Sequence, residues 1–342
     1  MLEVISDSRV LYDIKLELEE VYNKHMGLSF SSPTFILTAY NEFEFDSFKK
    51  DLFFIIAKEK NKIVNYIPLY IDQKKTLRFI FDVHTDFCGI IGEQPNFNFF
   101  KELSRIIVND SKIHRISLDN LLPDDLLLNA FKHFLGSGTL ICCYNNHSFI
   151  SSSVTKSFFE HLKSKEKSEL KRVQNKNRNY NFEVFNENKV FPEKQMRELR
   201  DQMIAKKLRN PDFLDDSFLA FSKVLYDAGE LEVFSKWDDN GQLVSCSLVL
   251  KNSRSNYRMV WIDLYADVQF INLSSYIDYI HYLEQYTPTT FNFGRGSYDY
   301  KAKNFQPQIQ NLYNLRYSKS KFDFLFTNYY LLKYFLKRIV KK

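Results

Sequence analysis

The sequence contains little glycine and little cysteine, and it has no long apolar run. Only 9 of its 342 residues are glycine, and no stretch approaches the roughly 18 apolar residues that a membrane-spanning helix needs. The 4 cysteines show neither a CxxC pair nor another metal-ligand spacing, so we expect reduced thiols and no metal. The first residues lack the basic and apolar regions of a signal peptide. These absences predict a cytoplasmic protein.

Aromatic side chains, in contrast, are abundant, with 33 Phe and 21 Tyr. Together with a hydrophobic fraction of 44%, they indicate an ordered chain with a substantial core. The net charge of +5, from 47 basic and 42 acidic residues, permits an anionic partner but does not require one. The length suggests two domains of about 150 residues each, which we place at residues 1–150 and 151–342.

Both halves of the chain alternate between strand and helix periodicity. The second half predicts a helix, a hairpin, a strand, a loop, a helix and a strand, at residues 215–229, 231–252, 256–266, 267–272, 273–286 and 289–294. The first half predicts a similar order, with a hairpin in 51–72 that turns at Lys60–Asn61, a strand at 76–83 and a helix at 97–110. We therefore expect an α/β protein built from two related halves.

The stretch FNFGRGSYDYK, from Phe291 to Lys301, is the most distinctive motif and holds two of the glycines. On this motif the chain resembles the GNAT N-acyltransferases, and more narrowly the tandem-GNAT group of Fem peptidyltransferases and polysaccharide-cluster acyltransferases. That group often has Phe-Asp-Phe-Gly-Arg-Gly followed by Tyr-Lys, and here Asn292 replaces the Asp. The resemblance extends to the hairpin 55–70, to DFCG (86–89) and to the basic segment near Lys167, over roughly residues 30–320.

The resemblance implies two GNAT-like domains, each with a mixed central sheet flanked by helices. It also implies that Lys301, with Tyr300 beside it, lies at the reacting centre, where a cation stabilises developing negative charge. Arg295 could bind a substrate phosphate or anchor the loop through a carboxylate, and Asp299 is a weaker candidate for substrate binding. From the residues alone, Arg295 could equally be a turn residue between two glycines.

The segment that joins the strand at 256–266 to the next helix is the candidate donor site. GNAT folds bind the pyrophosphate of acyl-CoA on backbone N–H groups at this place, because a helix N-terminus favours an anion. The candidate cofactor-binding residues are Gln269, Phe270, Asn272, Ser274 and Ser275. Asn272 and Ser274 stand where the family pattern has glycines, so their Cβ atoms narrow the approach of a phosphate. The alternative is an ordinary loop with Asn or Ser as helix cap.

Asp263 and Tyr265 are candidate acid–base residues. They project to the same face of one strand, close to its carboxyl end, where α/β sheets bind ligands. Asp263 would orient or deprotonate the amine, and Tyr265 would donate a proton. The alternative is an Asp that caps the following loop.

Two basic segments complete the candidates. In the predicted helix 156–178, Lys167, Lys171 and Arg172 could face a phosphate, although interspersed glutamates also fit a solvated helix. The C-terminal segment 321–342 is aromatic and basic at helical spacing. It could make a peripheral contact with an anionic membrane surface, or bury its aromatic face on the domain.

Taken together, these features predict an enzyme that transfers an acyl group from acyl-CoA to the amine of a nucleotide-linked (dTDP or UDP) amino sugar for surface polysaccharide biosynthesis. A Fem-type transferase that uses aminoacyl-tRNA and a peptidoglycan precursor is an alternative. The modest charge and the absence of a long heptad segment disfavour it, and we expect no nucleic-acid partner. A third possibility is a non-catalytic binding module on the same scaffold.

Overall fold

The computed structural model describes residues 1–25, 29–45, 51–135, 139–150, 152–154, 158–252, 256–286, 289–294, 303–305 and 307–320. The chain forms two compact units, one made of Met1–Asn145 with Asn311–Lys342 and the other of Asn146–Gln310. No helix in the described ranges combines the length and the apolar character needed to cross a membrane.

The first unit carries its helices and helical turns at α1 (Ser8–Asp13), α2 (Lys15–His25), Ser29–Ser31, α3 (Pro33–Ala39), Tyr40–Phe45, α4 (Phe97–Asn109) and α5 (Leu126–Leu135). One sheet has the strand order β1-β3-β4-β7, formed by Leu2–Ile5, Phe54–Glu59, Lys62–Ile67 and Ile91–Gly92. The other has the order β2-β5-β6-β8-β16-β9, formed by Asp51–Leu52, Leu69–Ile71, Thr76–Phe79, Arg115–Leu121, Gln308–Ser318 and Thr139–Ile150.

Local sequence explains where several of these elements begin and turn. The predicted hairpin is confirmed, because Lys60 and Asn61 both have positive φ, at 49° and 63°, as a tight two-residue turn between β3 and β4 requires. Helix α3 begins at Pro33, and the Ser32 hydroxyl accepts the Phe35 N–H at 3.0 Å. The predicted strand 76–83 ends early, at Phe79, because the chain turns at Phe81 with φ 59°.

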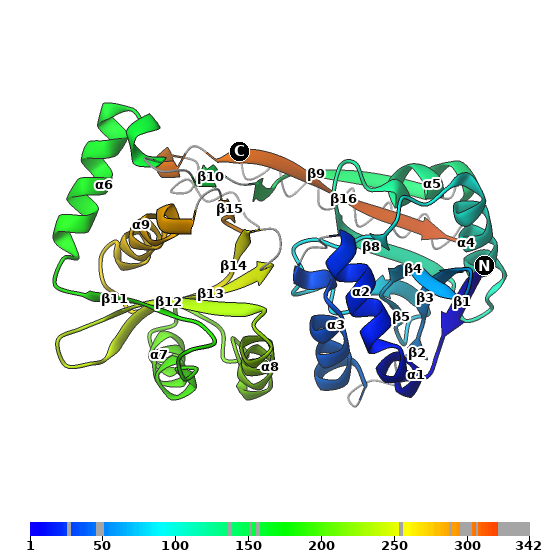
Figure 1. Ribbon diagram of the computed structural model, residues 1–342, viewed down its shortest axis with the longest axis horizontal. Helices are drawn as coiled ribbons and strands as arrows, with labels where there is room; N and C mark the ends of the chain where they lie inside the picture. Colours follow the sequence, from blue (N-terminus) through cyan, green and yellow to red (C-terminus); the bar gives the residue numbers. More distant parts are fainter. Residues whose placement is uncertain are drawn as a thin grey trace. The chain divides into compact units, whose positions relative to one another are not determined.

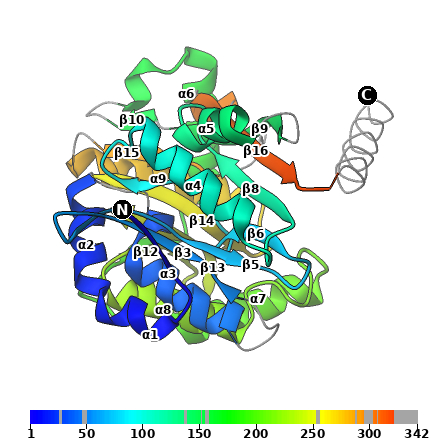
Figure 2. The same cartoon turned by 90° about the vertical axis from the view of Figure 1, so that its right-hand side faces the viewer.

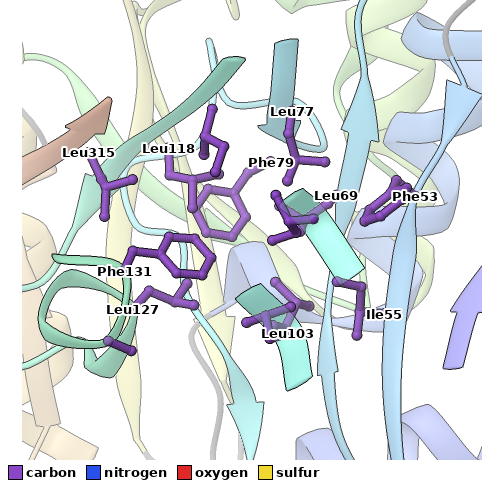
Figure 3. Packing of buried hydrophobic residues seen from close by; sticks show 14 of the residues in the cluster. Phe53, Ile55, Leu69, Leu77, Phe79, Leu103, Leu118, Leu127, Phe131 and Leu315 are labelled. Atoms are coloured by element: carbon purple, nitrogen blue, oxygen red, sulfur yellow. The ribbon is translucent and has the colours of Figure 1, made fainter. Parts of the chain in front are cut away.

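Helices α4 and α5 cover one face of the larger sheet with hydrocarbon side chains. Leu77 and Phe79 of β6 and Leu118 of β8 pack against Leu103 of α4 and Phe131 of α5 (Figure 3). Figure 2 shows α4 next to β6 and β8. This cluster is the main hydrophobic core that the described residues of the first unit form around that sheet.

The second unit is built on one mixed sheet with the order β10-β15-β14-β13-β12-β11. Its strands are Ser152–Val154, Thr289–Asn292, Tyr257–Tyr265, Leu243–Asn252, Leu231–Trp237 and Asn181–Phe185, and only β14 and β15 are parallel neighbours. Its helices and helical turns are Phe158–His161, α6 (Ser164–Lys176), α7 (Glu193–Ala205), α8 (Asp216–Asp227), α9 (Ile271–Leu283) and Glu284–Tyr286. The predicted helix 156–178 is therefore shorter than expected.

Helix α9 lies on one face of this sheet, and α7 and α8 lie on the other (Figure 1). Strand β14 carries a bulge, since Leu248 of β13 pairs with Ile262 whereas Val249 pairs with Val260, which leaves Trp261 as the extra residue. The Trp261 ring packs against Phe218 of α8 at 4.9 Å between centroids. A bulge turns the strand locally and is common beside active sites. Asp263 follows this bulge by two residues.

Candidate functional site

Asp263 is held on the α9 side of the sheet by three hydroxyl hydrogen bonds. The Ser247 hydroxyl donates to Asp263 Oδ1 at 2.6 Å, and the Tyr276 hydroxyl of α9 lies 3.2 Å from Oδ1 and 3.0 Å from Oδ2. Asp263 is half-buried. Hydrogen bonds of this kind fix the orientation of a carboxylate. The sequence analysis identified Asp263 as a candidate, but it did not find Tyr276.

Tyr265 lies across from Ser245 in the register of β13 and β14. The guanidinium carbon of Arg209 lies 5.9 Å from the Tyr265 ring centroid and 4.8 Å from the Phe213 ring centroid. Within the described residues, the buried Nε of Arg209 has no hydrogen-bond partner. The structure therefore places beside Tyr265 a cation that packs against two rings and that has no carboxylate partner in the described part of the chain. Sequence spacing could not reveal it, because its isolation depends on tertiary packing.

Helix α9 begins without a side-chain cap. Phe270 adopts the left-handed conformation (φ 63°), and the Ile271 N–H donates to the Val268 carbonyl at 3.2 Å. The N–H groups of Asn272 and Leu273 find no acceptor in the described part of the chain. Asn272 Oδ1 is buried without a partner there. Unpaired N–H groups in the first turn of a helix attract an anion.

The predicted donor loop is shorter than expected, because α9 starts at Ile271 rather than at residue 273. Ser274 and Ser275 therefore lie inside the helix and are buried. The Ser275 hydroxyl donates to the Ile271 carbonyl at 3.0 Å and to Ser245 Oγ at 3.1 Å, and Ser274 Oγ accepts from Lys236 at 2.6 Å. Both side chains thus anchor α9 to the sheet. The sequence placed both serines near the start of the predicted helix 273–286, but it gave no indication of this inward direction.

The C-terminal end of α6 packs on the start of α9. Asn177 Nδ2 donates to the Gln269 carbonyl at 3.3 Å, and Lys176 Nζ donates to the Gln269 side-chain oxygen. The Arg172 guanidinium carbon lies 4.8 Å from the Phe270 ring centroid, and Lys176 Nζ lies 5.7 Å from it. Two cations of the basic helix are therefore next to the uncapped helix start. The sequence analysis selected Arg172 as a candidate but did not select Lys176.

The other basic candidates of this helix are placed differently. Lys167 Nζ donates to the Glu160 carbonyl at 2.7 Å. Arg172 also makes a bidentate pair with Glu169, at 2.9 and 2.6 Å, which holds the pKa of that carboxyl below its usual value. Lys171 is exposed and has no partner among the described residues. For Lys167 these contacts fit the solvated-helix alternative, and for Arg172 they fit both interpretations.

The segment that carries Arg295, Asp299, Tyr300 and Lys301 lies outside the described residues. Immediately before it, Asn292 is buried, and its Oδ1 accepts the Gly294 N–H at 2.8 Å. This contact closes a local turn that Gly294 completes with φ 72°.

Aromatic residues on both sides of that segment meet at one tyrosine. Phe293 precedes the segment and Phe305 follows it, and their rings stack at 4.9 Å between centroids. The Tyr276 ring lies 5.9 Å from Phe293 and 6.3 Å from Phe305. The two ends of residues 295–302 are therefore anchored at the side chain that binds Asp263.

Comparison with known proteins shows likeness in structure only. No family model and no curated sequence matches the chain. The C-terminal domain of a candidate lysylphosphatidylglycerol synthetase from Agrobacterium fabrum matches with a TM-score of 0.61 at 12% identity, over 92% of this chain and 94% of that one. L-PGS from Bacillus licheniformis matches with a TM-score of 0.61 at 12% identity, over 91% of this chain and 93% of that one. FemX matches with a TM-score of 0.59 at 10% identity, over 93% of this chain and 97% of that one.

These matches cover nearly the whole of each chain, so they include both units. The fold is a FemX-like, GNAT-type tandem fold, in which mixed α/β units have sheets flanked by helices. The predicted fold class is confirmed. At identities of 10–12% the likeness concerns the fold and leaves the reaction open.

Proposed function

We propose that this protein is an N-acyltransferase that moves an acyl group from a phosphate-bearing carrier to an amine. One observation carries the proposal: the contact between Asp263 and Tyr276 directly adjoins the uncapped start of α9. Asp263 lies two residues before the end of the strand that leads into this helix, and Tyr276 belongs to the helix itself. A candidate base and a candidate anion site therefore share one strand–helix unit.

In the proposed reaction, Asp263 accepts a proton from the amine while the amine nitrogen attacks the acyl carbonyl. The new C–N bond forms, the bond from the carbonyl carbon to the carrier breaks, and Tyr265 or Tyr276 returns a proton to the leaving group. Lys301 stabilises the oxyanion of the tetrahedral intermediate. The anchoring of both ends of residues 295–302 at Tyr276 supports this role, and Tyr300 is proposed beside it.

The donor that we propose is acyl-CoA, with its pyrophosphate on the N–H groups of Asn272 and Leu273. Arg172 and Lys176 lie beside Phe270 and supply positive charge near this helix start. Cations combined with free N–H groups favour a phosphate more than either feature alone.

The acceptor that we propose is the amine of a nucleotide-linked (dTDP or UDP) amino sugar for surface polysaccharide biosynthesis. Arg209 supports an anionic acceptor, because its guanidinium lies beside Tyr265 and, within the described residues, has no carboxylate partner. A guanidinium on aromatic rings is well suited to bind a phosphate. Arg295 and Asp299 are proposed as further acceptor contacts.

A second candidate is a Fem-type transfer of an aminoacyl group from tRNA to a peptidoglycan precursor. The structural likeness to FemX and to L-PGS favours it. The basic face of α6 would then meet the carrier RNA rather than CoA.

Thermal unfolding with CoA, acetyl-CoA, UDP and dTDP tests these alternatives. A ligand at about 100 times its dissociation constant stabilises the folded protein by about 2.7 kcal/mol. Protection by CoA supports the acyl-CoA donor, and protection by UDP or dTDP supports the nucleotide-linked acceptor. If CoA gives none, an aminoacyl-tRNA assay separates the second candidate from a non-catalytic binding module. The Asp263→Asn variant should keep the ligand protection and lose turnover; full turnover by this variant would exclude Asp263 as the base.

A further inference from the structure

A buried lysine lies beneath the first two turns of α9. Lys236, near the end of β12, is only 2% exposed. Its Nζ donates to Ser274 Oγ at 2.6 Å and forms an ion pair with Asp278 Oδ2 at 2.7 Å. Gln174 of α6 donates from Nε2 to Asp278 Oδ1 at 3.3 Å. One buried ion pair therefore joins the sheet, α9 and the basic helix α6.

Stability alone is a weak explanation for this pair. Burying two charges costs desolvation energy that their attraction often fails to recover, and apolar replacements of such pairs are frequently neutral or stabilising. The neighbouring positions under α9 show that apolar residues fit there, since Phe234 and Val249 fill the same face. The ammonium and the carboxylate are thus an energetically costly choice for this position.

The position of the pair relates it to the start of the helix. The N–H of Asn272 is unpaired among the described residues, and Ser274 lies two positions after it. Asp278 lies one helical turn beyond Ser274. Asp278 keeps 25% of its side chain exposed, so the pair is not sealed from solvent. Charges within two turns of a helix terminus influence the binding of an ion there, because the low dielectric of the interior weakens screening.

We propose that Lys236 and Asp278 set the electrostatic potential at the start of α9 and thereby the affinity for the donor phosphate. The inference rests on the proposed function, which places that phosphate at Asn272 and Leu273. Lys236 acts as a positioning residue, through Ser274 and through its charge, without touching the ligand.

This role predicts opposite effects for the two halves of one ion pair. Lys236→Met leaves the Asp278 carboxylate unneutralised and repels an anion. Asp278→Asn leaves the Lys236 ammonium unneutralised and attracts an anion. A pair that only holds α9 in place would instead lose affinity in both variants, because each breaks the same contact.

Lys251 provides a matched control in the same sheet. It is 7% exposed, and its Nζ pairs with Glu187 Oε2 at 2.6 Å. Lys251 lies six residues along β13 from Ser245, the register partner of Lys236, which corresponds to about 20 Å. Lys251→Met therefore removes a buried, paired ammonium far from the start of α9.

Calorimetric titration of the full chain with CoA, and separately with inorganic pyrophosphate, measures the effect. Lys236→Met should bind each probe about tenfold more weakly than the unchanged protein, and Asp278→Asn at least as tightly. The double variant Lys236→Met/Asp278→Asn should bind each probe with an affinity within about threefold of the unchanged protein. Lys251→Met should bind with the same affinity as the unchanged protein. The spread between the two single variants should shrink as salt is raised.

Three results would overturn the inference while the proposed function stands: equal weakening by both single variants, no change in either, or the same loss in Lys251→Met. If Lys236→Met does not fold, Asp278→Asn decides alone, since weakened binding by that variant contradicts the charge effect. An unchanged protein that binds neither probe is a different result. It removes the proposed donor site and, with it, the role of the pair.

Discussion

The two units use the helix that covers their sheet in opposite ways, and the difference begins at its first turn. In the first unit, the Asn96 side chain accepts the Phe99 N–H at 3.0 Å and caps α4. In the second unit, α9 follows a left-handed Phe270 and has no side-chain cap. A capped terminus satisfies its own N–H groups, whereas an uncapped one leaves them for a ligand. The second unit therefore has the helix start that is suited to binding.

The side chains of the sheet beneath the two helices also differ: they are apolar under α4 and include buried polar groups under α9. Under α4 the sheet offers hydrocarbon, with residues such as Leu77 and Leu118. Under α9, beside the pairs already described, Arg258 Nε donates to Glu232 Oε1 at 3.0 Å, and the Tyr279 hydroxyl also donates to Glu232. Burial raises the pKa of Tyr279 well above its usual value. Buried polar groups cost stability and gather at functional sites, which supports the proposed site in the second unit.

Among changes that test this difference between the units, the largest effect should be a loss of kcat when Lys301 is replaced. Replacing Lys301 with Ala should lower kcat by about 10²–10³-fold, the size expected for one lost oxyanion donor. Lys303→Ala, two residues further on, should stay within about threefold. Steady-state kinetics with the donor identified by the ligand tests measures both. Near-normal turnover of Lys301→Ala would remove the residue from the reaction.

The next effect should be a loss of stability when a core side chain of the first unit is shortened. Leu103 of α4 is fully buried, so Leu103→Ala should cost about 3 kcal/mol of unfolding free energy through lost packing and a cavity. Because Leu103 belongs to the first unit and the proposed catalytic residues belong to the second, the kcat of the folded fraction should not change. Denaturant unfolding and kinetics on the same preparation measure the two quantities. A parallel loss of kcat would break the division of roles between the units.

The start of α5 in the first unit should make stability depend on pH. Asp125 Oδ1 accepts the Leu127 N–H at 2.8 Å, and burial raises the pKa of the Asp125 carboxyl to about 7, with Asp124 adding to the rise. The folded state therefore keeps a proton that the unfolded state loses above its pKa of about 4. Stability should fall as pH rises from about 4 to 7 and then level off.

Asp125→Asn should flatten that pH dependence, because an amide carries no proton to lose and can still accept the Leu127 N–H. Asp124→Asn should keep most of it. Thermal unfolding between pH 4.5 and 8 measures both variants. An Asp125→Asn protein with an unchanged pH profile would show that another group titrates.

The smallest effect should come from the cap of α4. Asn96→Ala should cost about 1 kcal/mol of stability, because the Phe99 N–H loses its acceptor. Asn109→Ala, at the other end of the same helix, should change stability by no more than about 0.5 kcal/mol. Binding of CoA should be unaffected by either variant. Weaker CoA binding by Asn96→Ala would show that the first unit takes part in donor binding.

Periodicity and turn chemistry predicted many of the elements, including the hairpin at Lys60–Asn61 and the helices that became α4 and α8. They missed β11 and β16, whose partners lie far away in sequence; β16 pairs with β8, for example through Leu315 and Leu118. Local patterns carry no information about such pairing. The position of Asp263 at a strand end was predictable, but its contact with Tyr276 depends on how α9 packs on the sheet.

The position of Ser274 also shows what local sequence patterns cannot predict. The family pattern suggested a side chain close to a phosphate, and the structure directs this side chain to Lys236. The sequence predicts Ser274 at the second position of a helix that begins at residue 273. In the structure α9 begins two residues earlier, at Ile271, and Ser274 is buried at the fourth position of the helix. Helix boundaries are the least certain part of a sequence-based prediction.

Strand β16 has a consequence for synthesis. The first unit's larger sheet contains β16, and most of this strand, from Asn311 to Ser318, is made only after Asn146–Gln310. A ribosome therefore releases every residue of the second unit before the first can complete its sheet, and domains generally fold as units as they emerge. The second unit can reach its final form first, although the chain begins with the other. An expression clone cut at the midpoint would leave β8 with an unpaired edge.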